Sequence, residues 1–140
     1  MIVHPKRNLF VCQGNVDRSP AGEGVYFEML RERGFNVGPF TSMDVFDFYV
    51  GSAGIEVSAQ NAFNGSVQLT LGLVALADRI FSADYLVTRG LVEKFGAYSK
   101  EIIQLNVEDG RSLLVPDQAR SLFEEYRRKL RDYVPERNPR

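Results

Sequence analysis

The chain has 140 residues, 44% hydrophobic and 25% charged, which is ordinary for a single globular domain. Its formal net charge of −1 provides no overall positive field that would attract nucleic acid or an anionic membrane surface. The longest apolar stretch, around residues 69–77, is too short to cross a bilayer, and a single cysteine cannot form an internal disulfide. We therefore expect one domain over residues 1–140, in the cytoplasm, without nucleic-acid or membrane partners.

Short apolar segments alternate with segments of helical spacing along the chain. In chain order, the expected elements are a strand at 8–11, a helix at 20–33, a strand at 44–50, a helix at 66–76, a strand at 79–83, a helix at 84–95, a strand at 102–107 and a helix at 119–133. Residues 135–140 are expected to form a frayed tail. Strands separated by helices imply a parallel sheet with helices on both faces.

The only cysteine, Cys12, comes at the end of the first expected strand. Gly14 and Asn15 follow it closely, and both residue types tolerate left-handed backbone, which lets successive N–H groups converge on one point. Arg18 lies six residues after Cys12, and its planar guanidinium matches two phosphate oxygens.

The next two residues, Ser19 and Pro20, predict the start of a helix, with Ser19 as N-cap and Pro20 at the first helical position. A strand, a tight loop and a helix N-terminus in that order aim N–H groups and the positive end of the helix dipole at one small volume. A cysteine in that field favours the thiolate form. The segment therefore predicts a thiolate nucleophile that faces an oxyanion site.

This segment, Cys12-Gln-Gly-Asn-Val-Asp-Arg18-Ser-Pro, resembles the loop of the low-molecular-weight protein tyrosine phosphatase family, which runs Cys-x5-Arg-Ser with Gly-Asn at the second and third x positions. Residues 52–55, Ser-Ala-Gly-Ile, are similar to the family's Ser-Ala-Gly element, and residues 77–81 are similar to its Ala-Asp-x-Ile strand entry. We expect Asp84, just after that strand, to be a turn or cap residue. The resemblance implies a single-domain, three-layer α/β sandwich whose four parallel strands have the order 2-1-3-4.

The resemblance also implies the roles of the loop residues. Cys12 attacks phosphorus and forms a phosphocysteine, Ser19 stabilises the thiolate, and Ser52 supports the loop by binding Asn15. The residues implied to bind the phosphate oxygens are Gln13, Gly14, Asn15, Val16, Asp17, Arg18 and Ser19. This chemistry combines nucleophilic and electrostatic catalysis, and we expect no metal and no cofactor.

The general acid has two candidates, because ester cleavage needs a carboxylic acid to protonate the leaving oxygen. Asp109 directly follows the expected strand 102–107, where short family members carry Ile-Pro-Asp, but Glu108 replaces the proline. Asp117 follows Pro116, as the family's Pro-Asp pair does, but it lies eight residues further on and just before the last helix. Position after the strand favours Asp109, with Asp117 as the alternative.

Asp17 occupies a position where family members often carry a second cysteine. A negative charge there disfavours the thiolate and weakens anion binding unless it points to solvent. The sequence predicts a phosphatase that acts on phosphotyrosine-type groups of a phosphorylated protein or a small phosphomonoester. The alternatives are an arsenate reductase that uses an external thiol and a catalytically weak phosphate-binding module. A phosphocysteine carrier fits less well, because such carriers lack the arginine that is present here as Arg18.

Overall fold

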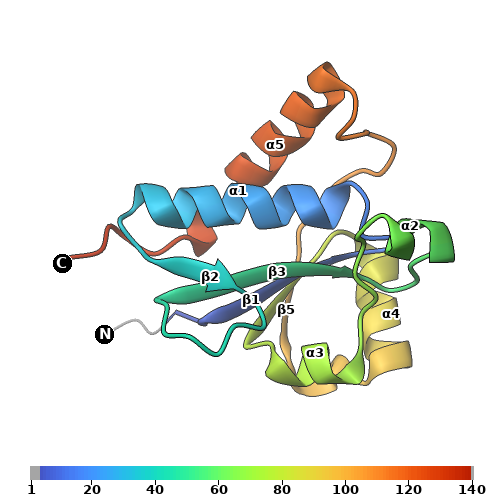
Figure 1. The fold of residues 1–140 in the computed structure, drawn as a ribbon, viewed down its shortest axis with the longest axis horizontal. Coiled ribbons are helices and arrows are strands. Elements are labelled where there is room, and N and C mark those ends of the chain that lie inside the picture. Colours follow the sequence, from blue (N-terminus) through green and yellow to red (C-terminus); the bar gives the residue numbers. More distant parts are fainter. Residues whose placement is uncertain (1–3, 140) are drawn as a thin grey trace.

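A parallel β-sheet with helices on both faces forms the framework of the computed structural model, which describes residues 4–139 (Figure 1). Its strands are β1 (Arg7–Cys12), β2 (Val37–Pro39), β3 (Phe48–Gly54), β4 (Arg79–Ser82) and β5 (Glu101–Gln104). Its helices are α1 (Arg18–Glu32), α2 (Ala59–Phe63), α3 (Leu71–Leu76), α4 (Tyr85–Phe95) and α5 (Pro116–Leu130), with short 3-10 helices at Ala97–Ser99 and Arg131–Tyr133. The strand order across the sheet is β2-β3-β1-β4-β5.

The expected three-layer sandwich and the order of its four expected strands are confirmed, since these four strands are β3, β1, β4 and β5. The structure adds a fifth strand, β2, which pairs with the outer side of β3. The sequence did not reveal β2 because it is only three residues long and contains Gly38 and Pro39, residue types that are rare in strands.

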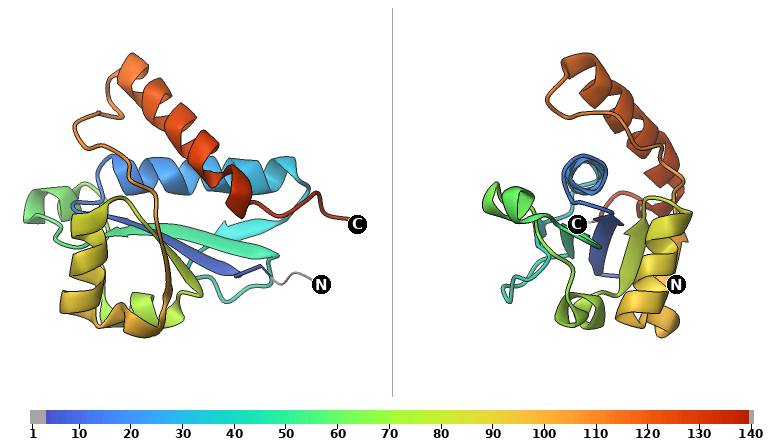
Figure 2. Two further views of the ribbon diagram at one scale, coloured as in Figure 1. Left: turned by 180° about the vertical axis from the view of Figure 1, so that it is seen from behind. Right: turned by 90° about the vertical axis from the view of Figure 1, so that its right-hand side faces the viewer.

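Helices α1 and α5 cover one face of the sheet, and α3 and α4 lie on the other (Figure 2). The side chains of β1 alternate between the two cores, because successive strand residues point to opposite faces. Phe10 packs with Tyr26 and Phe81 under α1 and α5, whereas Leu9 and Val11 belong to the opposite core. Burial of β1 on both faces fixes the position of Cys12 at its end.

The segment after β3 differs most from expectation. The helix expected at 66–76 is helical only over α3, which begins after Thr70, whose side chain accepts a hydrogen bond from Leu73 N. Gln68 instead forms a β-bridge with Gly54. Helix α2 was not expected, although Ser58 caps it by accepting from Asn61 N. The helix propensity of residues 66–70 was outweighed by the contacts of this segment with the end of β3.

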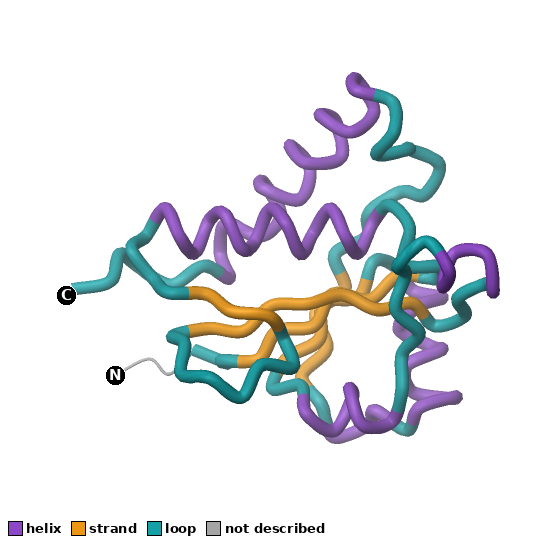
Figure 3. The backbone as a smooth tube through the Cα atoms, viewed as in Figure 1, coloured by secondary structure: helices purple, strands orange, loops and turns teal. Residues whose placement is uncertain are grey.

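Strand β3 also begins and ends later than expected. It runs from Phe48 to Gly54, so that Ser52 and Ala53 are strand residues paired with Phe10 and Val11, not a turn that closes the strand. The loops that follow β1, β3 and β5 reach the same end of the sheet (Figure 3). Ligands of open parallel sheets bind at this end.

The chain end is held against α1 as far as it is described. Asn138 N donates to the carbonyl of Arg33 at 2.7 Å, and the Arg33 side chain donates to the carbonyl of Pro135 at 3.0 Å. These bonds connect Pro135 and Asn138 to the end of α1. The frayed tail expected at 135–140 stays a prediction, and residue 140 lies outside the described residues. No helix within residues 4–139 is both long and apolar enough to cross a membrane.

Candidate active site

Cys12 is the last residue of β1, and its side chain is buried. Its Sγ lies 3.0 Å from Ser19 Oγ and accepts a hydrogen bond from Asn15 N at 3.2 Å. Ser19 also lies 3.3 Å from the carbonyl of Ala53, to which its hydroxyl can donate. The single hydroxyl hydrogen of Ser19 can therefore turn from this carbonyl to the sulfur when Cys12 is a thiolate. Two donors then stabilise the negative charge.

Asn15 holds the loop between β1 and α1 in shape. Its φ of 55° lies in the left-handed region, which asparagine tolerates better than most residues, whereas Gly14 does not adopt a positive φ. The Asn15 side-chain amide donates to Ser19 Oγ and to Ser52 Oγ, both at 2.9 Å. Its Oδ1 accepts from Val67 N at 2.7 Å. Asn15 thus joins the loop to β3 and to the segment before α3.

Gly54, at the end of β3, leaves the space that this loop occupies. A Cβ atom on Gly54 would lie 2.8 Å from both Asn15 N and the carbonyl carbon of Gly14, which are backbone atoms. Ser66 adds a further support, because its hydroxyl donates to the carbonyl of Asn15 at 2.7 Å. The loop therefore depends on two segments that lie far from it in the sequence.

The helix after the loop begins at Arg18, one residue before the expected N-cap. Asp17 takes the N-cap position without a side-chain capping bond, and Ser19 and Pro20 lie inside the first turn. The expected N-cap role of Ser19 is therefore wrong. Its hydroxyl is used by Cys12, Asn15 and the Ala53 carbonyl instead, so tertiary contacts decided where the helix begins.

Arg18 is buried and held in a fixed orientation. Its Nη1 donates to Asp84 Oδ2 at 2.7 Å and to the carbonyl of Val107 at 2.9 Å, and its Nε lies 3.7 Å from Asp109 Oδ1. Burial alone lowers the pKa of Arg18, but the hydrogen bond to Asp84 and the charges of Asp109 and Asp84 outweigh it and raise that pKa. The guanidinium therefore remains charged.

The two carboxylate oxygens of Asp84 bind different parts of the protein. Its Oδ1 accepts from Val87 N at 2.9 Å and caps α4, as expected from the sequence, while Oδ2 binds Arg18. Burial alone raises the pKa of Asp84, but the bonds from Arg18 and Val87 N outweigh it and lower that pKa. The contact with Arg18 was not expected from the sequence. The one sequence signal for this contact is the position of Asp84, directly after a strand that lies next to β1.

A pocket of about 250 Å³ opens over the sulfur and is lined by Cys12, Gln13, Gly14, Val16, Asp17, Arg18 and Asp109. The structure thus brings Asp109, on the loop after β5, to the same pocket as the cysteine. Asp109 is 76% exposed, and its Oδ1 accepts from Gly110 N at 2.9 Å. Asp117 does not line this pocket; it lies in the first turn of α5, is 90% exposed and pairs with Arg120.

Asp17 connects the two loops that form the pocket. Its Oδ1 accepts a hydrogen bond from Leu113 N at 2.9 Å, and Leu113 belongs to the same loop as Asp109. The Asp17 carboxylate therefore accepts a hydrogen bond from the loop that carries Asp109.

Replacing Asp17 with alanine is expected to raise the hydrogen-exchange rate of the Leu113 amide about 5-fold, since one hydrogen bond contributes about 1 kcal/mol. Asp17→Asn keeps an acceptor oxygen and is expected to leave that rate near the wild-type value. Amide exchange measured by NMR distinguishes the two variants. Equal protection of Leu113 in the alanine variant and the wild type would show that the bond does not order the loop.

Neither a protein-family model nor a curated protein sequence matches the chain. Solved structures with a similar fold include a mutant of YwlE from Bacillus subtilis, 21% identical, with a TM-score of 0.67 over 90% of this chain and 94% of that chain. Drosophila arginine phosphatase is 18% identical, with a TM-score of 0.65 over 91% and 94%. A low-molecular-weight protein tyrosine phosphatase from Streptococcus pyogenes is 19% identical, with a TM-score of 0.63 over 91% and 90%.

These similarities extend over 90–91% of this chain in each case. The resemblance inferred from the cysteine loop is therefore confirmed at the level of the fold. This chain has the fold of the low-molecular-weight protein tyrosine phosphatases.

Proposed function

We propose that the protein is a phosphatase that hydrolyses phosphotyrosine-type phosphomonoesters through a phosphocysteine on Cys12. The observation that carries this proposal is the pairing of a buried sulfur, bonded by Asn15 N and close to Ser19 Oγ, with the fixed guanidinium of Arg18 in one pocket. A thiolate beside a positively charged site that binds anionic oxygens is suited to attack on a phosphate ester.

The first step transfers the phosphoryl group to the enzyme. The Cys12 thiolate attacks phosphorus, an S–P bond forms, and the bond between phosphorus and the ester oxygen breaks. Asp109 donates its proton to that oxygen as it leaves. The loop N–H groups and the free edge of the Arg18 guanidinium bind the three non-bridging oxygens, while Nη1 remains bound to Asp84 and Val107.

The second step returns the enzyme to its starting state. Asp109, now a carboxylate, accepts a proton from a water molecule, and the water oxygen attacks phosphorus. The S–P bond breaks and its electron pair returns to the sulfur, which Ser19 and Asn15 N stabilise as a thiolate. Inorganic phosphate then leaves the pocket.

The preference for an aryl phosphate is supported by Val16, an aliphatic residue that lines the pocket and is 45% exposed. An aromatic leaving group can pack against such a side chain. We propose that the substrate is a phosphorylated protein or a small phosphomonoester, and that the protein acts in the cytoplasm, where a lone nucleophilic thiol stays reduced. The single sheet with its two helical layers supports one domain.

The test is turnover of p-nitrophenyl phosphate and of three phosphopeptides, which carry phosphotyrosine, phosphoserine or phosphoarginine. Phosphotyrosine is expected to be hydrolysed at least about 10-fold more efficiently than either of the others, since only its ring packs against Val16. Preference for phosphoarginine would overturn the proposed substrate class. Absence of turnover with all four would overturn the phosphatase proposal, and arsenate-dependent oxidation of an added thiol would favour a reductase.

The two candidate acids are separated by matched substitutions. Asp109→Asn is expected to lower kcat for p-nitrophenyl phosphate by about 10²-fold and to remove the decline in kcat at high pH, because the neutral amide cannot donate an acidic proton. Asp117→Asn is expected to leave kcat unchanged. The measurement is kcat as a function of pH for both variants. Loss of turnover in the Asp117 variant alone would assign the acid to that residue.

A further inference from the structure

A second cavity, of about 680 Å³, adjoins the cysteine loop outside the catalytic pocket. Helix α1, the end of β2, strand β3 and residues 64–67 surround it, and Val16 lines both this cavity and the catalytic pocket. We refer to it as the α1–β3 cavity. Its volume is in the range of small-molecule sites, typically 300–1,000 Å³.

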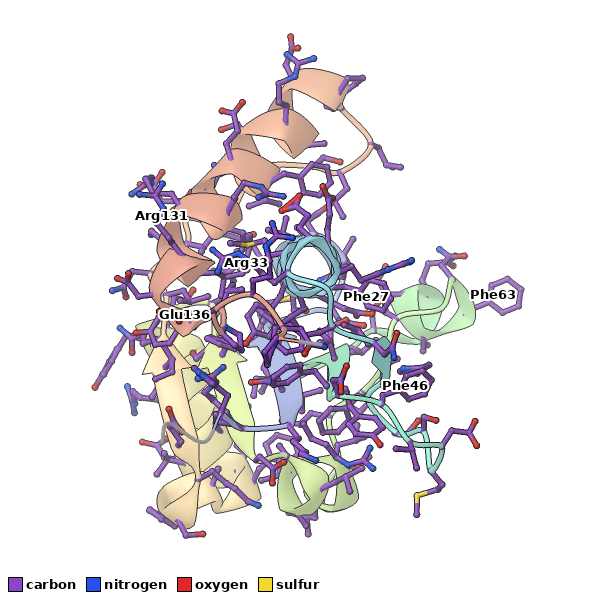
Figure 4. The ribbon with its side chains drawn as sticks, turned by 90° about the vertical axis from the view of Figure 1, so that its left-hand side faces the viewer. Phe27, Arg33, Phe46, Phe63, Arg131 and Glu136 are labelled. Atoms are coloured by element: carbon purple, nitrogen blue, oxygen red, sulfur yellow. The ribbon has the colours of Figure 1, made fainter. Side chains whose placement is uncertain are left out.

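The walls of the α1–β3 cavity are largely apolar. Phe27 from α1, Phe40 from the segment after β2 and Leu73 from α3 all line it. Figure 4 shows the ring of Phe27 leaving α1 on the side where α2 lies. Pro39, at the end of β2, and residues 64–67 also line the cavity, and Ser66 and Val67 are not part of the helix that was expected at 66–76. Such walls can bury an aromatic or aliphatic group.

Among the described residues, Glu23 is the charged side chain that lines this cavity. It is half-buried, and within residues 4–139 it forms neither a hydrogen bond nor an ion pair. The half-buried carboxylates of Asp84 and Glu125, in contrast, each bind a cation of this chain. A partly buried charge without a partner is unfavourable, and no lysine or arginine of the described chain lines the cavity to neutralise it.

We propose that the α1–β3 cavity binds a small organic cation, a primary amine or amidine attached to an apolar body. The cation pairs with the Glu23 carboxylate, and the body packs against Phe27 and Phe40, whose rings also attract a positive charge. This inference goes beyond the phosphatase proposal and does not depend on it, because the binding can be measured without any turnover.

The cavity also contacts the support of the cysteine loop. Ser52 and Ser66 line it, and both bind Asn15, at 2.9 Å through the side-chain amide and at 2.7 Å through the carbonyl. A ligand packed against these hydroxyls changes the environment of Asn15, whose backbone N–H donates to Cys12 Sγ. Occupation of the cavity is therefore coupled to anion binding in the catalytic pocket.

The binding test compares three probes of similar size and different charge: benzylamine, benzyl alcohol and benzoate. Calorimetry and NMR shift mapping on the wild type are expected to show benzylamine binding tightest, with shifts at Phe27 and Ser52. Glu23→Gln is expected to weaken benzylamine about 10-fold, as loss of a charged hydrogen bond does. Glu28→Gln, on another face of α1 and paired with Arg127, is the matched control and is expected to have no effect.

A second variant tests the site independently, in case Glu23→Gln does not fold. Leu73→Trp adds volume to the cavity from α3 and is expected to block benzylamine while Glu23 is intact. Equal binding by Glu23→Gln and the wild type, equal binding of benzoate, or shifts centred on Gln13 and Asp109 would each overturn the site. For the coupling, saturating benzylamine is expected to change the Kd of inorganic phosphate about 5-fold in the wild type, and an unchanged Kd would overturn it.

Discussion

Replacing Cys12 with serine is expected to lower kcat for p-nitrophenyl phosphate by on the order of 10⁴-fold or more, because an un-ionised hydroxyl is a far weaker nucleophile than a thiolate. Binding of inorganic phosphate is expected to remain, since the guanidinium of Arg18 keeps its contacts with Asp84 and Val107. Steady-state turnover and calorimetric titration of phosphate measure these two properties separately.

The two measurements together decide whether Cys12 reacts with the substrate. Loss of turnover with phosphate binding retained supports nucleophilic catalysis by Cys12. Turnover within about 10-fold of the wild type would show that another group attacks phosphorus, because removal of a nucleophile normally costs several orders of magnitude. Loss of both turnover and phosphate binding, with a wild-type melting temperature, would indicate that the thiol mainly shapes the loop.

Substitution of Gly54 by alanine is expected to lower kcat/KM by about 10²-fold, because displacement of a catalytic group by about 1 Å can have an effect of that size. The added Cβ meets backbone atoms of Gly14 and Asn15 at 2.8 Å, and neither can rotate away as a side chain could. The loop must therefore move relative to β3, and with it the N–H group that binds the sulfur. Steady-state kinetics and thermal unfolding of the purified variant measure the effect.

Gly24→Ala is the matched control for this substitution. Gly24 lies on an exposed part of α1, and an added Cβ there meets no atom within 4 Å. Alanine is favoured over glycine inside a helix, so the variant is expected to be more stable by roughly 0.5–1 kcal/mol with unchanged turnover. Wild-type turnover in Gly54→Ala would show that the loop tolerates a larger separation from β3.

Much of the candidate site was accessible from the sequence because its parts are local. Cys12, the loop after it and Arg18 lie within seven residues, and a strand that leads into a helix brings them together whatever the rest of the chain does. Asp109 was favoured over Asp117 for a similar reason, since the end of β5 lies at the same edge of the sheet as the end of β1. The structure places Asp109 in the cysteine pocket.

The remaining parts of the site depend on contacts between distant segments, which no local pattern encodes. The partners of Arg18, namely Asp84 and the carbonyl of Val107, lie 66 and 89 residues away. Ser66 supports Asn15 from a segment whose spacing indicated a helix. The local sequence pattern also predicted Ser19 as a helix N-cap, whereas in the structure its hydroxyl contacts Cys12 Sγ.

Strand β2 also determines how the sheet meets its surroundings. Without β2, the outer side of β3 would be a seven-residue strand of almost entirely buried residues, which is a template for pairing with another chain. Val37, Gly38 and Pro39 cover it at Phe48–Val50, and Pro39 has no N–H group to offer. On the opposite side, β5 is four residues long and begins at the exposed Glu101. Both outer edges of the sheet are therefore short, which protects the protein from edge-to-edge aggregation.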